Sequence, residues 1–387
     1  MISAGLPKLL LLVAFMVFNS SLRAQESSSE EIARLTVSEM RFIKDLKVEG
    51  DFIYCVGFRY FDENKRLSVL NKYDLKLNLI WSKVIHDAET NRFDYLFIDE
   101  DRIFVSGCIG KIEMSGIEAQ RYLYEFSDDG EMRRRTLIGP AAIPSTPIRR
   151  FKTKLWFAHR AYSPKPGSSS ISEIPMFTEL VSYDIETQKL ERYQGALQNV
   201  NPSNLIVEAS KVLVYGSFYQ TASASISQVY ILSLEGTKLK EKLVEREHAE
   251  WLLSTVFYPV DQEAHLISFK AGGPDSLRYL RMETYDFESN LLSSKQLSAN
   301  ALGVEIKHIN YYTFNEDNHI WLLLKEASHY KYLRYNRQAE ELERLKLPYL
   351  RSNPRPFFIS SELQIQAISD DNALGQNVIL ITGQSRD

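Results

Sequence analysis

The sequence contains few of the residues, and none of the motifs, that mark common metal and catalytic sites. Its 387 residues include two cysteines and seven histidines. No HExxH motif or other pair of histidines at ligand spacing is present, so the sequence does not support a metal site. It also has no GxSxG nucleophile elbow and no phosphate-binding glycine loop. We therefore predict no metal and no cofactor, and we assign no catalytic residue.

An excess of basic residues is also lacking. The chain has 46 Lys and Arg against 50 Asp and Glu, a formal net charge of −4. A general nucleic-acid binder would carry a basic patch, so we predict no nucleic-acid partner. No linker rich in Pro, Gly and Ser divides the chain, which favours one domain after the N-terminal segment.

The first 24 residues have the pattern of a secretory signal peptide. Lys8 precedes an unbroken apolar run over 9–18, and small or polar residues follow it up to Ala24. The run of ten residues is about half of what a bilayer-spanning helix needs. We predict cleavage after Ala24, a flexible N-terminus over 25–30, no transmembrane anchor in the mature chain, and a periplasmic or secreted location. A short signal-anchor is the alternative.

A short phrase recurs along almost the whole chain: a polar turn, then four or five apolar residues, often closed by glycine. It reads Gly-Asp-Phe-Ile-Tyr-Cys-Val-Gly at 50–57 and Lys-Val-Leu-Val-Tyr-Gly at 211–216. The gaps between the first apolar residues of successive phrases are 50, 52, 57, 53, 55 and 43 residues. Strand-rich repeats of about 40–50 residues are typical of β-propeller blades. These first apolar residues are Ile53, Ile103, Leu155, Val212, His265, Ile320 and Leu363.

Each unit divides into four predicted strands. In the first unit they cover 40–48, 52–58, 67–73 and 79–85. The third strand ends each time in an aromatic or apolar residue followed by Asp, Ser or Asn, whose side chain can cap the next turn. The fourth strand is charged, as expected of an outer edge exposed to water. This turn signature appears as Tyr73-Asp74, Phe126-Ser127, Tyr183-Asp184, Leu232-Ser233, Tyr285-Asp286 and Tyr335-Asn336.

The two ends of the chain complement each other. The last unit has predicted strands at 356–359, 363–368 and 377–382, and then the sequence stops one strand short. A strand-like segment at 31–38 is left over before the first unit, so we predict that it supplies the missing strand and closes the ring. The prediction is an all-β fold, a single β-propeller domain over 31–387 with seven four-stranded blades. A six-bladed ring is the alternative, because the phrases at His265 and Leu363 are weak.

The phrase pattern and this closing arrangement resemble secreted bacterial β-propeller proteins, over residues 31–387. The resemblance concerns the fold, and its motifs are loose. Within the repeat, Cys55 and Cys108 fall at different distances from their phrase starts, so strand alternation sends them to opposite faces of their sheets. We expect two buried free thiols, with a disulfide between neighbouring blades as the alternative.

One face of such a propeller carries the connections between second and third strands and those between blades, and a site is expected there. Tyr60, Tyr162 and Tyr219 each lie seven residues past a phrase start, where the second strand leaves its blade. Such tyrosines, with basic or amide neighbours, suit a sugar or peptide ligand, although packing between blades would equally explain them. The remaining candidate ligand-binding residues on this face are Arg59, Arg160, Gln220, His86, Trp251 and Arg351.

These observations favour a secreted or periplasmic binding or scaffold module that presents this face to a peptide, protein or glycan. The alternative is a glycan hydrolase or lyase with its site in the central funnel. An enzyme needs two or three titratable groups within hydrogen-bond reach, whereas a binding face needs an aromatic or apolar patch. His159 and His265 lie within strand phrases, and we expect them to be packed rather than catalytic.

Overall fold

The computed structural model describes the backbone of most of residues 26–384, and side chains for most of 40–216 and parts of 230–298. The gaps in the backbone are 38–39, 41, 62–64, 88–89, 111, 114–115, 118, 142–144, 163–175, 198–200, 209–210, 222–223, 246–249, 259–262, 271–278, 287, 289, 299–305, 310–314, 317–318, 327–328, 337–341, 347–353, 360–362 and 370–376. Every described element is a β-strand. No helix in this part of the chain is long and apolar enough to cross a membrane.

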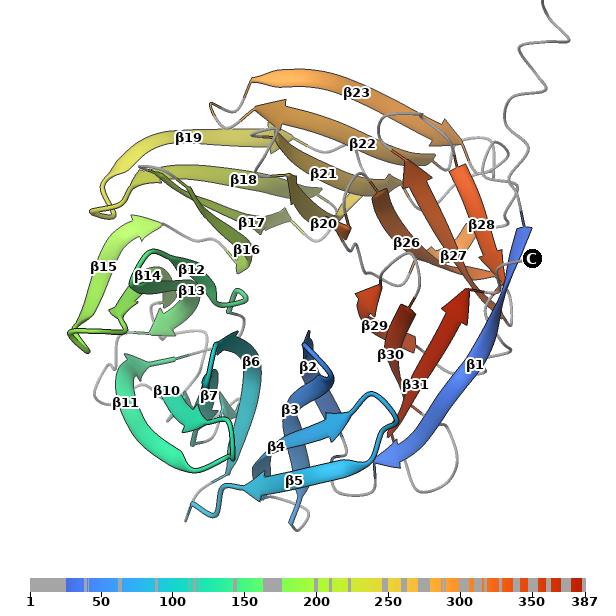
Figure 1. Cartoon of the computed structure of the whole chain (residues 1–387). Coiled ribbons are helices and arrows are strands. Elements are labelled where there is room, and N and C mark those ends of the chain that lie inside the picture. Colours follow the sequence, from blue (N-terminus) through green and yellow to red (C-terminus); the bar gives the residue numbers. More distant parts are fainter. Residues whose placement is uncertain are drawn as a thin grey trace, which may run out of the picture.

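Four-stranded antiparallel sheets follow one another along the chain (Figure 1). Sheet 1 consists of β2 (Phe42–Glu49), β3 (Phe52–Tyr60), β4 (Arg66–Asp74) and β5 (Leu79–Val84). Sheet 2 consists of β6 (Asn91–Asp99), β7 (Arg102–Ile109), β10 (Gln120–Ser127) and β11 (Met132–Pro140). The strands of sheet 1 lie where the alternation and the turn residues of the sequence predict them.

Three more sheets repeat this order. Sheet 3 consists of β12 (Arg149–Phe151), β13 (Lys154–Tyr162), β14 (Met176–Asp184) and β15 (Leu190–Leu197). Sheet 4 consists of β16 (Asn201–Glu208), β17 (Lys211–Thr221), β18 (Ala224–Ser233) and β19 (Lys238–Glu245). Sheet 5 consists of β20 (Glu250–Tyr258), β21 (Glu263–Lys270), β22 (Tyr279–Asp286) and β23 (Leu291–Ser298).

The remaining strands form one sheet of nine strands. One half contains β24 (Ile306–Ile309), β25 (Asn315–Glu316), β26 (His319–Glu326), β27 (His329–Asn336) and β28 (Leu342–Lys346). The other half contains β29 (Pro354–Ile359), β30 (Leu363–Ser369), β31 (Asn377–Gln384) and the N-terminal strand β1 (Glu26–Val37). A small hairpin, β8 (Ile112–Glu113) with β9 (Gly116–Ile117), lies between β7 and β10 and has no counterpart among the strands that the sequence predicts.

The N-terminal strand is longer than the sequence predicts. Residues 29–37 pair antiparallel with β31, the strand expected to lack a partner. Glu26, Ser27 and Ser28 pair in parallel with β28. Where the sequence predicts a flexible segment over 25–30, the structure places residues 26–30 in β1, with 26–28 paired to β28 and 29–30 paired to β31.

The sheets stand around a common centre and pack face to face, which is the arrangement of a β-propeller. Figure 1 shows β2, β6, β16 and β20 toward the centre and β5, β11, β19 and β23 at the rim. The middle strands β3, β4 and β7 are buried along almost their whole length, whereas β5, β11 and β23 are largely exposed or half-buried. From sheet 1 to sheet 5, one apolar cluster lies between each sheet and the next. Cys55 and Cys108 are both buried free thiols, as expected.

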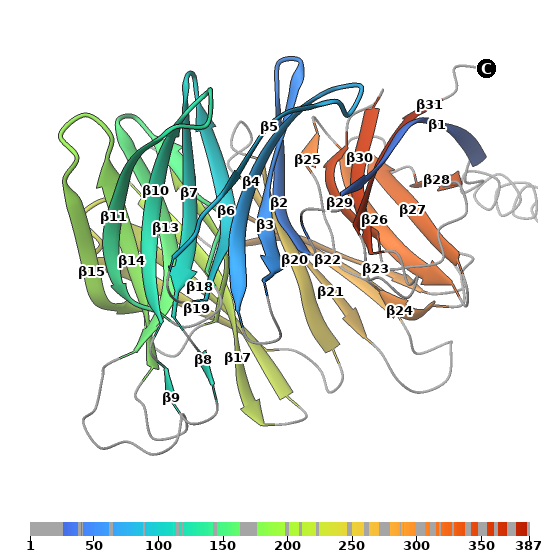
Figure 2. The ribbon, with the colours of Figure 1, turned by 90° about the horizontal axis from the view of Figure 1, so that it is seen from below.

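Two faces of the molecule differ in their connections (Figure 2). We call the face with the hairpins between first and second strands and between third and fourth strands the turn face. The opposite face, which carries the connections between second and third strands and those between sheets, is the loop face. The predicted side-chain caps are present on the turn face. The capping residues are Asp74, Ser127, Asp184, Ser233 and Asp286, each of which accepts a hydrogen bond from a backbone N–H two to four residues further on.

On the turn face, side chains of one sheet form hydrogen bonds with a hairpin turn of the next sheet. The turn between β10 and β11 carries Asp128, which accepts hydrogen bonds from Tyr54 Oη (2.5 Å) and from Lys72 Nζ (2.6 Å) of sheet 1. Trp81 of the same sheet donates to the Asp128 carbonyl at 3.0 Å. In sheet 4, Lys240 donates in the same way to the backbone of Glu288 in the turn of sheet 5.

Candidate functional site

An aromatic group with a basic rim lies at the loop face of sheet 1. Phe42 stacks on Phe58 with ring centroids 4.9 Å apart, and Tyr60 meets each of these rings at 6.1 Å with steep interplanar angles. The guanidinium of Arg66 lies 5.2 Å from the Phe58 ring centre and 5.5 Å from that of Tyr60. Lys44 Nζ approaches Phe58 at 5.6 Å. We call these five residues the aromatic cluster.

Strand register brings the aromatic cluster together. Phe58 and Tyr60 are two residues apart in β3 and therefore share one face of the sheet. Phe42 of β2 lies directly opposite Phe58, and Arg66 of β4 lies directly opposite Tyr60. Cross-strand pairs of this kind are the closest side-chain neighbours in an antiparallel sheet. The face they share is the one that packs on sheet 2, and the cluster lies where that interface ends at the loop face.

The cluster continues outward at Phe61. This side chain is 65 % exposed, and Lys65 Nζ lies 5.6 Å from its ring centre. The Phe61 N–H donates to the Lys65 carbonyl at 2.8 Å, which holds the end of β3 close to the start of β4. An exposed aromatic ring with an ammonium group beside it combines apolar contact area with hydrogen-bond donors. That combination is suited to recognising a ligand.

The other candidates on sheet 1 lie outside this cluster. Arg59 is half-buried and alternates to the opposite face of β3, away from Tyr60. His86 is exposed in the connection between sheets 1 and 2. Of the candidates that the sequence suggests on sheet 1, only Tyr60 belongs to the aromatic cluster. The sequence does not single out Phe42, Phe58 or Arg66, which become neighbours of Tyr60 through the pairing of three strands.

Tyr162, at the position equivalent to Tyr60, is buried. Its hydroxyl donates to the Ala119 carbonyl of sheet 2 at 3.1 Å, so the ring packs between sheets. Arg160 is half-buried and donates from Nη1 to Asn201 Oδ1 at 2.5 Å, which links sheet 3 to the start of sheet 4. Tyr219, Gln220 and Trp251 are in strands β17 and β20, but their side chains lie outside the described part, as does Arg351 altogether.

A second polar group, buried between sheets 2 and 3, lies at the loop end of their apolar interface. Arg92, Cys108 and Arg121 form one row across β6, β7 and β10. Asp94 lies 3.1 Å from Arg121 Nη1 and 3.2 Å from Arg92 Nε. Across the interface, Glu179 pairs with His159 at 3.2 Å and with Arg192 at 3.0 Å. We call the set Arg92, Asp94, Arg121, His159, Glu179 and Arg192 the ionic cluster.

Protonation in the ionic cluster follows from burial and pairing. Burial lowers the pKa of His159, and the hydrogen bond that its imidazole donates to Glu179 opposes this only in part. Burial alone would raise the pKa of Glu179, but hydrogen bonds from His159 and Arg192 outweigh it and hold that pKa below its usual value. His159 and Glu179 have no solvent-exposed side-chain surface. As expected, His159 and His265 are both packed residues.

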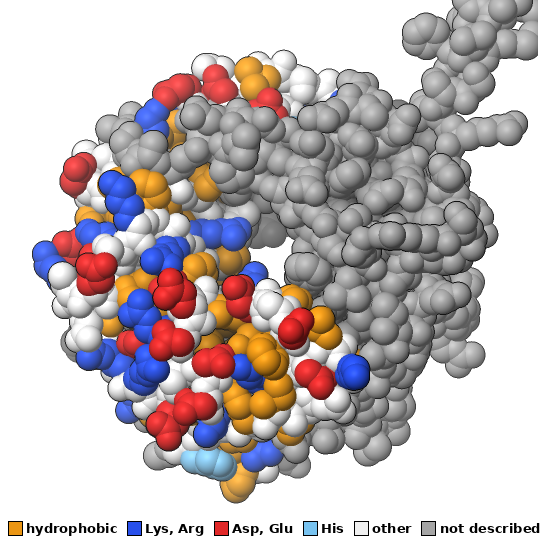
Figure 3. Space-filling view, viewed as in Figure 1, with side chains coloured by type: hydrophobic (Ala, Val, Ile, Leu, Met, Phe, Trp, Pro, Cys, Tyr) orange, Lys and Arg blue, Asp and Glu red, His pale blue; other side chains and the backbone are white. Residues whose placement is uncertain are grey.

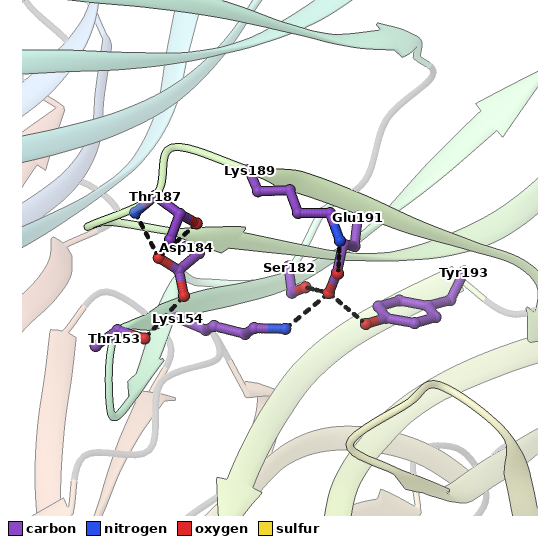
Figure 4. Close-up of polar contacts among 8 residues, drawn as sticks. All are labelled: Thr153, Lys154, Ser182, Asp184, Thr187, Lys189, Glu191 and Tyr193. Atoms are coloured by element: carbon purple, nitrogen blue, oxygen red, sulfur yellow. Dashed lines mark hydrogen bonds and ion pairs between the residues drawn. The ribbon is translucent and has the colours of Figure 1, made fainter.

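Glu191 is the centre of another polar network, at the turn-face end of sheet 3 (Figure 4). Its carboxylate accepts hydrogen bonds from Lys154, Lys189 and Tyr193 at 2.7–3.0 Å. These bonds, led by that of Lys154, lower the pKa of Glu191 to about 2. The groups drawn around Glu191 engage one another and tie β13, β14 and β15 together. We therefore assign this network to the stability of the sheet.

In the part of the chain whose side chains are described, no group of three or more His, Cys, Asp or Glu residues could hold a metal ion. The turn face carries interspersed charges of both signs over its described surface (Figure 3). In the aromatic cluster Phe58 is buried and the other four residues are half-buried, and the exposed surface comes from Phe61, the residue after Tyr60. The aromatic cluster together with Phe61 is the described group on the loop face that combines aromatic rings with basic side chains.

The similarity of this chain to known proteins is confined to the fold. No protein-family model and no curated protein sequence matches it. Among solved structures, it resembles a chain from a structural and mechanistic analysis of two prolyl endopeptidases, with a TM-score of 0.54 and 11 % identity over 90 % of this chain and 51 % of that chain. This chain therefore spans about half the length of that protein.

Two further similar structures fit less closely. The Dos1 propeller has a TM-score of 0.49 and 12 % identity, over 88 % of this chain and 78 % of that chain. A chimera named ACO/RPE65 D477G has a TM-score of 0.40 and 11 % identity, over 64 % of this chain and 58 % of that chain. Identities this low concern the fold alone, since one fold hosts many unrelated functions.

Proposed function

We propose that the chain is a seven-bladed β-propeller closed by its N-terminal strand, and that it binds a protein, peptide or glycan ligand through the loop face. Support for seven units comes from the innermost strands. A register shift interrupts the pairing of β2, β6, β16, β20 and β29 with the strand that follows each, and the pairing of β24 with β26. With the short strand β12, which pairs without a shift, this makes seven first strands.

Support for closure comes from two contacts between the ends of the chain. Strand β1 completes a four-stranded arrangement with β29, β30 and β31. Strand β2 lies beside β29. The face of sheet 1 directed away from sheet 2 carries its own buried apolar set, including Met40, Leu46 and Cys55. Pairing the terminal strands removes two sheet edges that would otherwise invite aggregation.

The observation that carries the binding function is the aromatic cluster with Phe61. Stacked rings preorganise a contact surface, and Arg66, Lys44 and Lys65 supply donors and positive charge at its rim. Aromatic residues and arginine dominate binding energy at protein interfaces because they bury large area at small entropic cost. The same groups can stack on sugar rings and hydrogen-bond to them.

The enzymatic alternative, a glycan hydrolase or lyase, has less support. The ionic cluster does bring titratable groups together, but its carboxylates are engaged by arginines. His159 and Glu179 are fully enclosed. A general acid or base must reach the substrate, directly or through one water. For this reason we favour binding over catalysis.

The proposed location is the periplasm or the outside of the cell, supported by the signal-peptide pattern of residues 1–24. Amino-terminal sequencing of the exported protein should then begin at Gln25. If the protein is found on membranes and still carries residues 1–24, this result would contradict the proposed location and favour the signal-anchor alternative.

The binding proposal is tested with the mature protein on glycan and peptide arrays, beside the variants Tyr60→Ala and Arg66→Ala. Each variant should weaken the binding found for the unaltered protein about tenfold or more, as for central interface residues. Arg133→Ala is the matched control, because Arg133 is exposed on the outer strand β11 and pairs there with Asp101. Equal binding by all four proteins would rule out the aromatic cluster. Cleavage of an arrayed glycan would instead favour the enzymatic alternative.

A further inference from the structure

Arg121, a member of the ionic cluster, is completely buried between sheets 2 and 3. Its exposed fraction is 0 %. It lies directly opposite Cys108, in a pairing of β10 with β7 that has no register shift. Phe104 of β7 belongs to the apolar cluster between sheets 2 and 3, so strand alternation places Cys108, and with it Arg121, on the face directed at sheet 3. Both sheets therefore separate the guanidinium from bulk water.

One edge of this guanidinium has no acceptor. Nη1 donates to Asp94 Oδ2 at 3.1 Å. Nε and Nη2 together form the side edge of the planar group, and neither has a hydrogen-bond partner in the part of the chain that the structure describes. About nine-tenths or more of the buried polar groups in proteins are paired, because a buried donor without an acceptor loses its hydration and gains nothing in return. Two adjacent charged donors in this state require an explanation.

The charges of the ionic cluster do not balance. Glu179 is matched by Arg192, whose Nε lies 3.0 Å from both carboxylate oxygens. Asp94 is shared by two guanidinium groups, at 3.2 Å from Arg92 Nε and 3.1 Å from Arg121 Nη1. Three arginines thus face two carboxylates, and an excess of one positive charge remains at Arg92 and Arg121.

The other described polar groups of this interface add donors rather than negative charge. Ser106 lies on the same face of β7 as Cys108, and Ser145 stands opposite His159 in an isolated bridge. Both serine hydroxyls are buried, and neither has a hydrogen-bond partner in the described ranges. Burial raises the pKa of the Cys108 thiol and so keeps it uncharged. An imidazole such as that of His159 is neutral or positive, but never negative.

We propose that the interface of sheets 2 and 3 binds a small monovalent anion, chloride, at the side edge of Arg121. One negative charge balances the cluster, and Nε–H and Nη2–H can both donate to the same ion. A water molecule would accept these bonds but would leave the excess charge uncompensated in a medium of low dielectric. Close packing between the sheets favours a single-atom anion over a phosphate or carboxylate group. The site is separate from the aromatic cluster, and the bound ion would stabilise the contact of the two sheets.

Thermal unfolding of the mature protein tests this proposal, with sodium chloride compared with sodium gluconate at equal ionic strength. Chloride at about tenfold its Kd should raise the Tm by about 2 °C, and the rise should level off as the site fills. Arg121→Met leaves Arg92 and Asp94 as a balanced pair and should abolish the rise. Arg133→Met removes an exposed arginine of β11 and should retain it. No rise in the unaltered protein, or an equal rise in both variants, would overturn the proposal.

Bromide gives a second readout, which does not depend on a variant that folds. Crystals of the unaltered protein grown in sodium bromide should show an anomalous scattering peak at the side edge of Arg121. Ordered density at this edge without an anomalous peak would identify a water molecule there and would contradict the proposal. Bromide peaks at surface arginines alone would identify an adventitious ion only, which also contradicts it.

Discussion

His159 and Glu179 form a buried pair at the interface of sheets 2 and 3, and their neighbours decide how the pair responds to pH. Arg121 faces His159 from sheet 2, and Arg192 holds Glu179 from the outer strand of sheet 3. While His159 is neutral, its imidazole adds no further positive charge next to these two guanidinium groups. Protonation of His159 is therefore opposed by burial and by the charge of Arg121.

We predict that stability falls as the pH is lowered from about 6.5, the pKa of an unperturbed histidine. The folded pKa of His159 lies below that value, so the unfolded chain binds a proton in this range that the folded chain does not. The free energy of unfolding then decreases with falling pH, by up to about 1.4 kcal/mol per pH unit, until the folded pKa is reached. Urea unfolding between pH 7 and pH 5 measures this slope.

The control for this slope is a pair of matched variants. His159→Gln should flatten the pH dependence, because the titrating group is gone. His86→Gln should leave it as it is, because His86 is exposed in a connection between sheets. An unchanged slope in His159→Gln would assign the pH dependence to other groups.

At this scale, residue spacing predicted where Tyr60 and Tyr162 lie in their strands but not what surrounds them. Both are at the end of a second strand. Tyr60 meets Phe42 and Arg66 because those residues pair with β3, whereas the hydroxyl of Tyr162 reaches the carbonyl of Ala119 in the neighbouring sheet. A repeat defines a position within one sheet, but the environment also depends on what the next sheet places against it.

Among the elements, the hairpin between β10 and β11 acts as a clasp between sheets 1 and 2. Asp128 at its tip accepts from Tyr54 and Lys72, and Lys72 is almost completely buried. The Lys72 ammonium also lies 4.1 Å from the ring centre of Phe52. Hydrogen bonds from Lys72 and Tyr54 overcome the effect of burial and hold the pKa of Asp128 below its usual value. The clasp therefore compensates a buried positive charge.

We predict that Asp128→Ala lowers the free energy of unfolding by about 2 kcal/mol, because it leaves the Lys72 ammonium buried without a carboxylate. Asp129→Ala in the same turn should cost clearly less, since that side chain is exposed and interacts within its own turn. The double variant Asp128→Ala with Lys72→Met should regain part of the loss. Thermal or urea unfolding of the three variants measures the difference, and equal losses for Asp128→Ala and Asp129→Ala would contradict the clasp.

The strands themselves follow closely from the sequence, because alternation and turn residues are local signals. The third-strand signature and its caps are an example, since Asp74 and Asp184 bond to N–H groups within four residues. The register shifts of the first strands and the β8–β9 hairpin were not predicted. A shift leaves no mark on composition, and the hairpin lies in the connection between the second and third strands of sheet 2.

For the whole molecule, the leftover strand-like segment near the N-terminus predicts a pairing with the last strand of the chain. The pairing of β1 with β31 follows that prediction, although β1 begins at Glu26 and also reaches β28. The ligand could not be predicted in the same way. The residues that repeat most regularly are apolar and join the sheets, while the aromatic cluster depends on which strands place their side chains together.

The measurement that bears most directly on the closed propeller compares a chain that begins at Met40 with one that begins at Gln25. The shorter chain lacks β1 and so leaves β31 and β28 without their partner. We predict that the chain from Gln25 unfolds in one cooperative thermal transition, and that the chain from Met40 aggregates or shows no such transition. A chain from Met40 that melts cooperatively at the same temperature as the chain from Gln25 would contradict closure by the N-terminal strand.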